Sequence, residues 1–146
     1  MAKPTPVEVN DFVIAVFPSI VKDGYSCDAI GVRSAVCRWT LDETRLRPGG
    51  LISGPTQFSA ADMALWFLAF TELGLAPMAV TSNMTIDFLK PASGGDLLAT
   101  ATMLRAGRSR ITGRVDIRVE GNDQIVGHAT GSYSVLRTPS SNDCAS

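Results

Sequence analysis

The sequence predicts an α+β domain in which an antiparallel β-sheet of about five strands wraps around one long, buried helix, with a short helix at the N-terminus. Two observations support this prediction. Residues 56–71 carry a single charge among alanines, leucines and aromatics, and from residue 79 onward apolar side chains recur at every second position between short turns. Short turns join neighbouring strands in antiparallel order, so the sheet is expected to be antiparallel.

The predicted central helix has clear start and stop signals. Gly54 and Pro55 mark its start, because proline is well tolerated in the first helical turn, and Gly74 marks its end. Asp62 is the only charged residue between positions 56 and 71. A helix that is apolar nearly all round is buried in the core. This one is too short and too interrupted by polar residues to span a membrane.

Asp62 therefore carries a carboxylate within an apolar helix. Burying a carboxylate is costly unless it is paired, hydrogen-bonded or functional. A structural interpretation is that Asp62 is satisfied by neighbours or faces solvent at the edge of the helix. We favour a functional interpretation, because titratable groups in apolar clefts are the usual candidates for functional sites.

The remaining elements follow from periodicity. Apolar residues at helical spacing predict a short covering helix that ends near Phe17, because Pro18 interrupts it. Residues 30–41 are predicted as a first strand. Residues 1–6 and the Ser/Pro/Asn-rich tail from residue 138 are expected to be flexible.

Four further strands are expected, each joined to the next by a short hairpin connection: residues 80–88, 97–104, 110–119 and 125–136. Alternation places Val80 and Met84 on one face of the first of these and Thr81 on the other. The last strand has a face of small residues that ends in Tyr133 and Val135. Such a face would let the backbone approach the buried helix closely.

Composition limits the possible functions. A formal net charge of −1 gives no electrostatic footprint for nucleic acid. The three cysteines lack metal-ligand spacing and are expected to be reduced thiols in a cytoplasmic protein, and the chain contains one histidine, so a metal site is not expected. No targeting segment or membrane span is expected. We interpret residues 1–146 as one domain with its core at about 28–136.

Two segments carry a family resemblance. The first is Arg47-Pro-Gly-Gly-Leu-Ile-Ser-Gly-Pro55, with Asp62 nine residues after Ser53; the second is residues 79–92, followed by Gly95-Asp96 and Gly107-Arg108. Together they resemble the hotdog-fold acyl-CoA thioesterases, specifically the phenylacetate-degradation (PaaI-type) branch. The family usually has Asn-x-x-Gly-x-x-His-Gly-Gly, with an acidic residue nine positions after the histidine. Here Arg47, Ser53 and Pro55 replace its Asn, His and second Gly.

The resemblance implies roles for individual residues. Asp62 would be the general base or the nucleophile, the Gly54 N–H would polarise the thioester carbonyl, and Thr81 would assist the attacking water. The expected substrate-binding residues are Arg47, Ser53, Pro55, Gln57, Phe58, Trp66, Lys90, Arg108 and Arg110. Arg105 is a further candidate for the phosphates of coenzyme A. For each of these cations a solvated surface position is the alternative.

The resulting hypothesis is a hydrolase that uses coenzyme A only as part of its acyl-CoA substrate, with no metal and no other cofactor. A non-catalytic acyl-CoA-binding hotdog protein is the alternative, and an unrelated α+β ligand-binding protein is a third. His128, on the polar face of the last strand, is expected to be a surface residue, which disfavours dehydratase chemistry. Gly54 and Asp62 lie about 12 Å apart along one helix. We therefore expect a homodimer with sites at the subunit interface, and the family implies a homotetramer built as a dimer of dimers.

Overall fold

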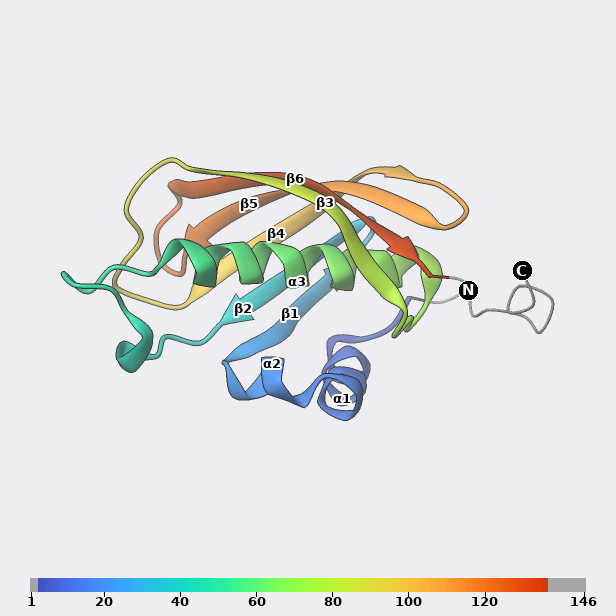
Figure 1. Cartoon of the computed structure of the whole chain (residues 1–146), viewed down its shortest axis with the longest axis horizontal. Coiled ribbons are helices and arrows are strands. Elements are labelled where there is room, and N and C mark those ends of the chain that lie inside the picture. Colours follow the sequence, from blue (N-terminus) through green and yellow to red (C-terminus); the bar gives the residue numbers. More distant parts are fainter. Residues whose placement is uncertain (1–2, 137–146) are drawn as a thin grey trace, which may run out of the picture.

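The computed structural model describes residues 3–136. A six-stranded antiparallel sheet, in the order β1-β2-β4-β5-β6-β3, curves around the central helix α3 (Figure 1). The prediction of an antiparallel sheet around a buried helix is confirmed. The elements are α1 (Pro6–Val16), α2 (Pro18–Lys22), β1 (Tyr25–Gly31), β2 (Ser34–Trp39), a 3-10 turn (Glu43–Arg45), α3 (Gly54–Leu73), β3 (Ala79–Phe88), β4 (Leu97–Ala106), β5 (Arg110–Val119) and β6 (Ile125–Val135).

The central helix begins and ends where the sequence predicts. Ser53 is its N-cap, and the Ser53 hydroxyl accepts a hydrogen bond from the N–H of Thr56 at 3.2 Å. Gly74, with φ of 73°, is its C-cap and donates to the carbonyl of Phe70. Nearly every residue from position 60 to position 70 is buried. The helix is therefore the core of the domain and not a surface element.

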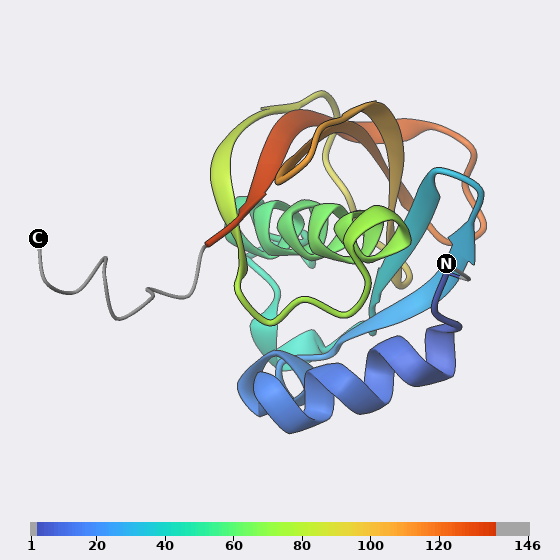
Figure 2. The same cartoon turned by 90° about the vertical axis from the view of Figure 1, so that its right-hand side faces the viewer.

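The end-on view shows the curved sheet wrapping around α3 (Figure 2), and glycines on the inner face of the sheet allow the helix to pack closely. A Cβ added at Gly131 of β6 would lie 3.0 Å from Cδ1 of Leu65, and one at Gly113 of β5 would lie 2.7 Å from Cδ2 of Leu68. The expectation that small residues on the last strand permit close approach is confirmed, and β5 uses the same device.

The prediction of one strand over residues 30–41 is wrong, because β1 and β2 form a hairpin there. The turn lies at Val32-Arg33, and Arg33 takes a left-handed conformation with φ of 55°. Turns of this kind usually contain glycine or asparagine at such a position. Because this position holds an arginine, the sequence contains no recognisable signal for the turn between β1 and β2.

The prediction that four consecutive strands are joined by hairpins is wrong at its first connection. β3 pairs with β6 at the sheet edge, and residues 89–96 carry the chain back to β4 in the middle of the sheet. Two backbone hydrogen bonds hold this connection in place. The N–H of Leu89 donates to the carbonyl of Val126, and the N–H of Ile52 donates to the carbonyl of Ala92, both at 2.8 Å. Such non-local pairing depends on which strand covers α3, and the local sequence does not show it.

A β-bulge in β3 changes the facing of Thr81. The pairing register with β6 shifts between Thr81 and Asn83. One extra residue reverses the alternation at that point. Thr81 therefore points toward α3, where Met84 also packs against the core, whereas Val80 is exposed. The predicted opposite facing of Thr81 and Met84 is wrong for this reason.

The N-terminal helix prediction is confirmed, with two refinements. Thr5 and Glu8 form a capping box at the start of α1, so ordered structure begins inside the segment expected to be flexible. Pro18 ends α1 as predicted, but it also occupies the first turn of α2, a helix that was not predicted. The predicted flexible tail from residue 138 lies outside the described residues.

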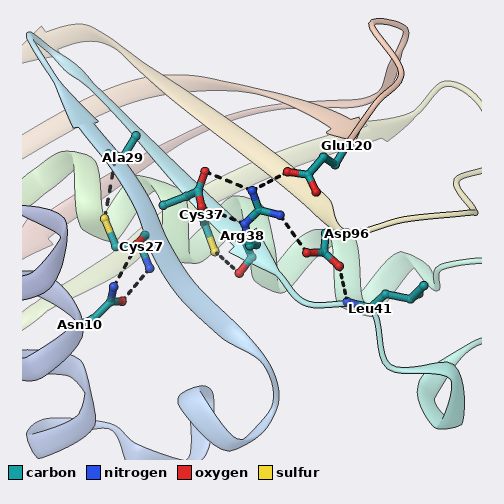
Figure 3. Close-up of polar contacts among 9 residues, drawn as sticks. Asn10, Cys27, Ala29, Cys37, Arg38, Leu41, Asp96 and Glu120 are labelled. Atoms are coloured by element: carbon teal, nitrogen blue, oxygen red, sulfur yellow. Dashed lines mark hydrogen bonds and ion pairs between the residues drawn. The ribbon is translucent and has the colours of Figure 1, made fainter.

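A cluster of ion pairs around one arginine, Arg38, connects neighbouring strands on the outer face of the sheet (Figure 3). The Arg38 guanidinium bonds the carboxylates of Asp28 (2.8 Å), Asp96 (2.8 Å) and Glu120 (2.6 Å). Asp96 also accepts the N–H of Leu41 at 2.8 Å, and this bond, together with Arg38, lowers the pKa of the Asp96 carboxyl. The Gly-Asp pair of the second motif is thus a structural tie between β2, β4 and the β5–β6 turn.

Candidate active site

The carboxylate of Asp62 is partly buried and is held by hydroxyl groups from two strands. Its Oδ1 accepts hydrogen bonds from the Thr81 hydroxyl of β3 at 2.5 Å and from the Tyr133 hydroxyl of β6 at 2.9 Å. Its Oδ2 receives no hydrogen bond from the described residues. Two donors on one oxygen orient the carboxylate and leave the other oxygen with its lone pairs free.

Tyr133 is a site residue that the sequence interpretation did not assign. Its side chain is buried, and burial raises its pKa, with the charge of Asp62 adding to the effect. The phenol therefore stays protonated and acts as a hydrogen-bond donor. Its place in the sequence could have indicated this role. Among the small inward-facing residues of β6, Tyr133 alone carries a large ring with a polar hydroxyl.

Asp62 opens into a pocket of about 310 Å³, here called the carboxylate pocket. Asp62 is the only charged residue among residues 3–136 that lines this pocket. Three of the predicted site residues line the carboxylate pocket: Asp62, Trp66 and Thr81. Its lining residues are Val16, Phe17, Asp62, Met63, Trp66, Pro77, Ala79, Val80, Thr81 and Tyr133.

At the start of α3 one backbone amide is left open. Pro55 has no N–H, the N–H of Thr56 donates to the Ser53 hydroxyl, and the N–H of Gln57 donates to the Ser53 carbonyl at 3.1 Å. The N–H of Gly54 donates to no acceptor among residues 3–136. A free N–H at a helix start, where the helix dipole is positive, favours an oxygen that carries negative charge.

Gly54 opens into a second pocket of about 490 Å³, the helix-start pocket. Four other predicted residues line it with Gly54: Arg47, Pro55, Gln57 and Lys90. Predicted Phe58 lies beside it, in an apolar hollow of about 440 Å³ that Gly54 also lines.

Three of these predicted residues have structural contacts of their own. The Ser53 hydroxyl serves as the cap of α3, and the Lys90 ammonium bonds the side chain of Gln124. The Gln57 amide donates to the carbonyl of Ile52 at 3.3 Å, while its buried Oε1 has no partner in the described structure. These three predicted substrate-binding residues therefore make contacts that stabilise the fold.

The predicted cations Arg108 and Arg110 lie elsewhere, at the β4–β5 hairpin. Arg110 lines a pocket of about 290 Å³ with Arg105, Gly107 and Thr112, and Arg108 lies exposed in the turn outside its lining. None of the three arginines pairs with a carboxylate of the described residues. We call Arg105, Arg108 and Arg110 the basic hairpin.

The carboxylate and the open amide do not meet within one chain. Asp62 and Gly54 line different pockets and stand eight residues apart on one straight element. That separation is about 12 Å along the helix axis. A single thioester carbonyl cannot contact both groups of one subunit.

His128 lies on the outer face of β6, as predicted, where its Nδ1 is 2.9 Å from Oδ1 of Asp116. Within residues 3–136 no group of three or more His, Cys, Asp or Glu side chains could hold a metal ion. In the same range, none of the helices combines the length and the apolar character needed to cross a membrane.

A curved antiparallel sheet that wraps around one long buried helix defines the hotdog fold. The chain belongs to the thioesterase superfamily, whose family model matches residues 49–126. The resemblance to the hotdog-fold thioesterases is confirmed, the PaaI proteins share the fold, and the chain is a thioester hydrolase.

Individual relatives agree with this assignment. A candidate thioesterase from Silicibacter sp. TM1040 superposes with a TM-score of 0.82 at 32% identity, covering 91% of this chain and 92% of that one. The PaaI protein of Escherichia coli, from its phenylacetic acid degradation operon, superposes with a TM-score of 0.68 at 22% identity, covering 88% and 96%. A candidate esterase of Thermoplasma acidophilum is 26% identical over 98 residues, which is 66% of this chain and 72% of that protein.

Proposed function

We propose that this thioesterase hydrolyses acyl-CoA thioesters in sites shared by two subunits, with Asp62 from one subunit and Gly54 of the partner subunit. One observation carries the proposal: Thr81 and Tyr133 both bond Oδ1 of Asp62, which leaves Oδ2 free at the carboxylate pocket. An oriented carboxylate with one free oxygen suits a general base or a nucleophile.

The chemistry follows from these two groups. The open N–H of Gly54 and the dipole of α3 stabilise the negative charge that develops on the thioester oxygen. As a base, Oδ2 of Asp62 takes a proton from a water molecule whose oxygen attacks the carbonyl carbon. The tetrahedral intermediate then expels the thiolate of coenzyme A, which receives the proton. As a nucleophile, Oδ2 would attack the carbon itself and expel the thiolate of coenzyme A. Water would then hydrolyse the resulting mixed anhydride, which releases the carboxylic acid, restores the Asp62 carboxylate and supplies the proton that the thiolate takes up.

The exposed edge of the sheet supports the shared site. β3 is a ten-residue edge strand that ends in an exposed aromatic side chain, Phe88. The exposed Phe58 of α3 lines the same hollow as Phe88, and the ring of Phe88 also lies over Gly54. Long apolar edge strands are normally paired or covered. Pairing two copies along this edge by a two-fold axis would bring the two α3 helices together. A further pairing of dimers into a homotetramer rests on the family resemblance.

We assign the phosphates of coenzyme A to the basic hairpin. Its three arginines, Arg105, Arg108 and Arg110, are exposed and have no carboxylate partner in the described structure. Arginine matches phosphate geometry well. In this scheme coenzyme A takes part only as the leaving group of the substrate, and the reaction uses no other cofactor.

Asp62→Asn tests the catalytic carboxylate. We expect the variant to fold and to lose turnover by orders of magnitude over a panel of acyl-CoA substrates, measured as release of free thiol. Asp116→Asn, which changes a carboxylate on the outer face of the sheet, is the matched control and should retain activity. Near-normal turnover by Asp62→Asn would refute the assignment. Binding of acyl-CoA without turnover by the wild-type chain would favour the non-catalytic alternative.

Mixing two inactive variants tests the shared site. Gly54→Pro removes the amide. Its fold should survive because Ser53 already has an extended backbone (φ −69°, ψ 156°) and the three heavy atoms nearest to an added Cβ all belong to the ring of Phe88. Subunits carrying Gly54→Pro or Asp62→Ala are mixed after reversible dissociation. Half of the random dimers would be mixed, each with one intact site, so activity should return to about a quarter of wild type. A mixture that stays inactive would place the site within one subunit.

A further inference from the structure

The N-terminal helices supply one wall of the carboxylate pocket. Val16 and Phe17, at the junction of α1 and α2, line it although their side chains are 44% and 43% exposed. The ring of Phe17 lies 6.4 Å from that of Trp66, at an interplanar angle of 61°. Trp66 follows Asp62 by four residues, so it lies about one helical turn beyond the carboxylate.

The backbone at Phe17 and the ring of Trp66 are both held in place. Pro18 ends α1 and starts α2, so the chain bends at Phe17, whose N–H donates to the carbonyl of Val13 at 2.7 Å. The Trp66 indole donates to the carbonyl of Ala76 at 3.2 Å, and its ring packs 5.1 Å from that of Phe70. Phe17 therefore forms a wall that a ligand in the pocket would touch.

We propose that this pocket holds the acyl group, that Phe17 sets the size of the acyl group accepted, and that the preferred substrates carry uncharged, apolar acyl groups of medium size. This inference rests on the proposed hydrolysis at Asp62. It assigns substrate selection to a residue outside the motif segments, on a helix junction at the other end of the sequence.

The charge of the pocket supports an uncharged acyl group. Among residues 3–136 of one subunit, Asp62 is the only charged residue that lines the pocket, and the hydroxyls of Thr81 and Tyr133 are already engaged with its Oδ1. These residues therefore supply no free side-chain cation for an acyl group with a second carboxylate. Such a group would also be repelled by Asp62.

The volume supports a medium size. An apolar cavity of roughly 150 Å³ holds a benzene molecule. The carboxylate pocket, at about 310 Å³, has room for about twice that volume. An acetyl group would leave most of this volume empty, and a long-chain acyl group would extend beyond the pocket, past Phe17.

The test compares wild type with Phe17→Ala, Phe17→Trp and Ile14→Ala. We measure kcat/KM for straight-chain acyl-CoA substrates from two to sixteen carbons, and for succinyl-CoA against butyryl-CoA. For wild type we expect kcat/KM to rise about fourfold per methylene up to a medium chain length and then to fall. Phe17→Ala should move the optimum to longer chains, and Phe17→Trp to shorter ones. Ile14 is exposed on α1 and does not line the pocket, so Ile14→Ala should leave the profile unchanged.

Unchanged optima in both Phe17 variants would overturn the role of Phe17, and equal turnover of succinyl-CoA and butyryl-CoA would overturn the uncharged acyl class. A second measurement separates this inference from the proposed hydrolysis. Calorimetry with non-hydrolysable S-alkyl-CoA thioethers reports chain-length preference in the absence of turnover. Shifted preferences in the Phe17 variants, combined with a wild type that hydrolyses nothing, would support the pocket and refute the reaction. Unshifted preferences combined with normal hydrolysis would refute the pocket alone.

Discussion

Replacing Asp96 tests whether the Gly-Asp pair of the second motif acts in structure or in catalysis. Its carboxylate accepts the N–H of Leu41 and bonds the guanidinium of Arg38, both at 2.8 Å (Figure 3). Asp96→Asn retains an acceptor oxygen for Leu41 and loses the charge. Asp96→Ala loses both contacts, so the two variants separate the ion pair from the backbone bond.

The magnitudes follow from these contacts. A partly exposed ion pair contributes about 1 kcal/mol, and a backbone hydrogen bond to a charged group about as much again or more. We expect unfolding free energies lower by about 1 kcal/mol for Asp96→Asn and by about 2–3 kcal/mol for Asp96→Ala. For a chain of this size, each kcal/mol lowers Tm by about 3 °C.

Scanning calorimetry at several pH values measures these differences. The pKa of Asp96 is lowered in the folded state, so its contribution is complete above the unfolded value of about 3.9 and is lost as pH falls toward the folded pKa. The Tm gap between wild type and Asp96→Asn should therefore be full at pH 6 and shrink below pH 4. Asp123→Asn, at an exposed turn position, is the control.

Two results would contradict this reasoning. A Tm for Asp96→Ala equal to that of the Asp123→Asn control would show that the cluster contributes no stability. A kcat/KM per folded molecule that falls by orders of magnitude at temperatures well below Tm would show that Asp96 takes part in the reaction.

Three further predictions follow from the core and the site. Gly113→Ala should lower the unfolding free energy by about 1–3 kcal/mol in denaturant titrations, because the new Cβ would lie 2.7 Å from Cδ2 of Leu68; an unchanged midpoint would contradict the packing. Burial raises the pKa of the Cys27 thiol to about 12 and that of Cys37 further, so mass spectrometry should find neither thiol alkylated at pH 8 unless denaturant is present. Tyr133→Phe should lower kcat about tenfold with little change in KM, because it removes one donor from the carboxylate that we propose as catalytic but no substrate contact; a change in KM alone would contradict that role.

The sequence by itself determined the elements whose signals are local. The start at Gly54, the end at Gly74 and the apolar character between them predicted the central helix, because caps and hydrophobic periodicity are properties of adjacent residues. The same reasoning found the later strands and the isolated carboxylate of Asp62. The motif residues then identified the family, and the small residues of β6 predicted close packing on the helix.

Only the tertiary structure decided which distant elements meet. The order of the sheet depends on β3 pairing with β6 and not with β4, a choice made by packing around α3. Thr81 reaches Asp62 because of a bulge that alternation cannot show, and Tyr133 joins them from a strand 71 residues away from Asp62. Phe17, near the start of the chain, lines the carboxylate pocket together with residues of α3, which begins at Gly54. Local propensity specifies elements, whereas a site is made by long-range contacts that exist only after the chain has folded.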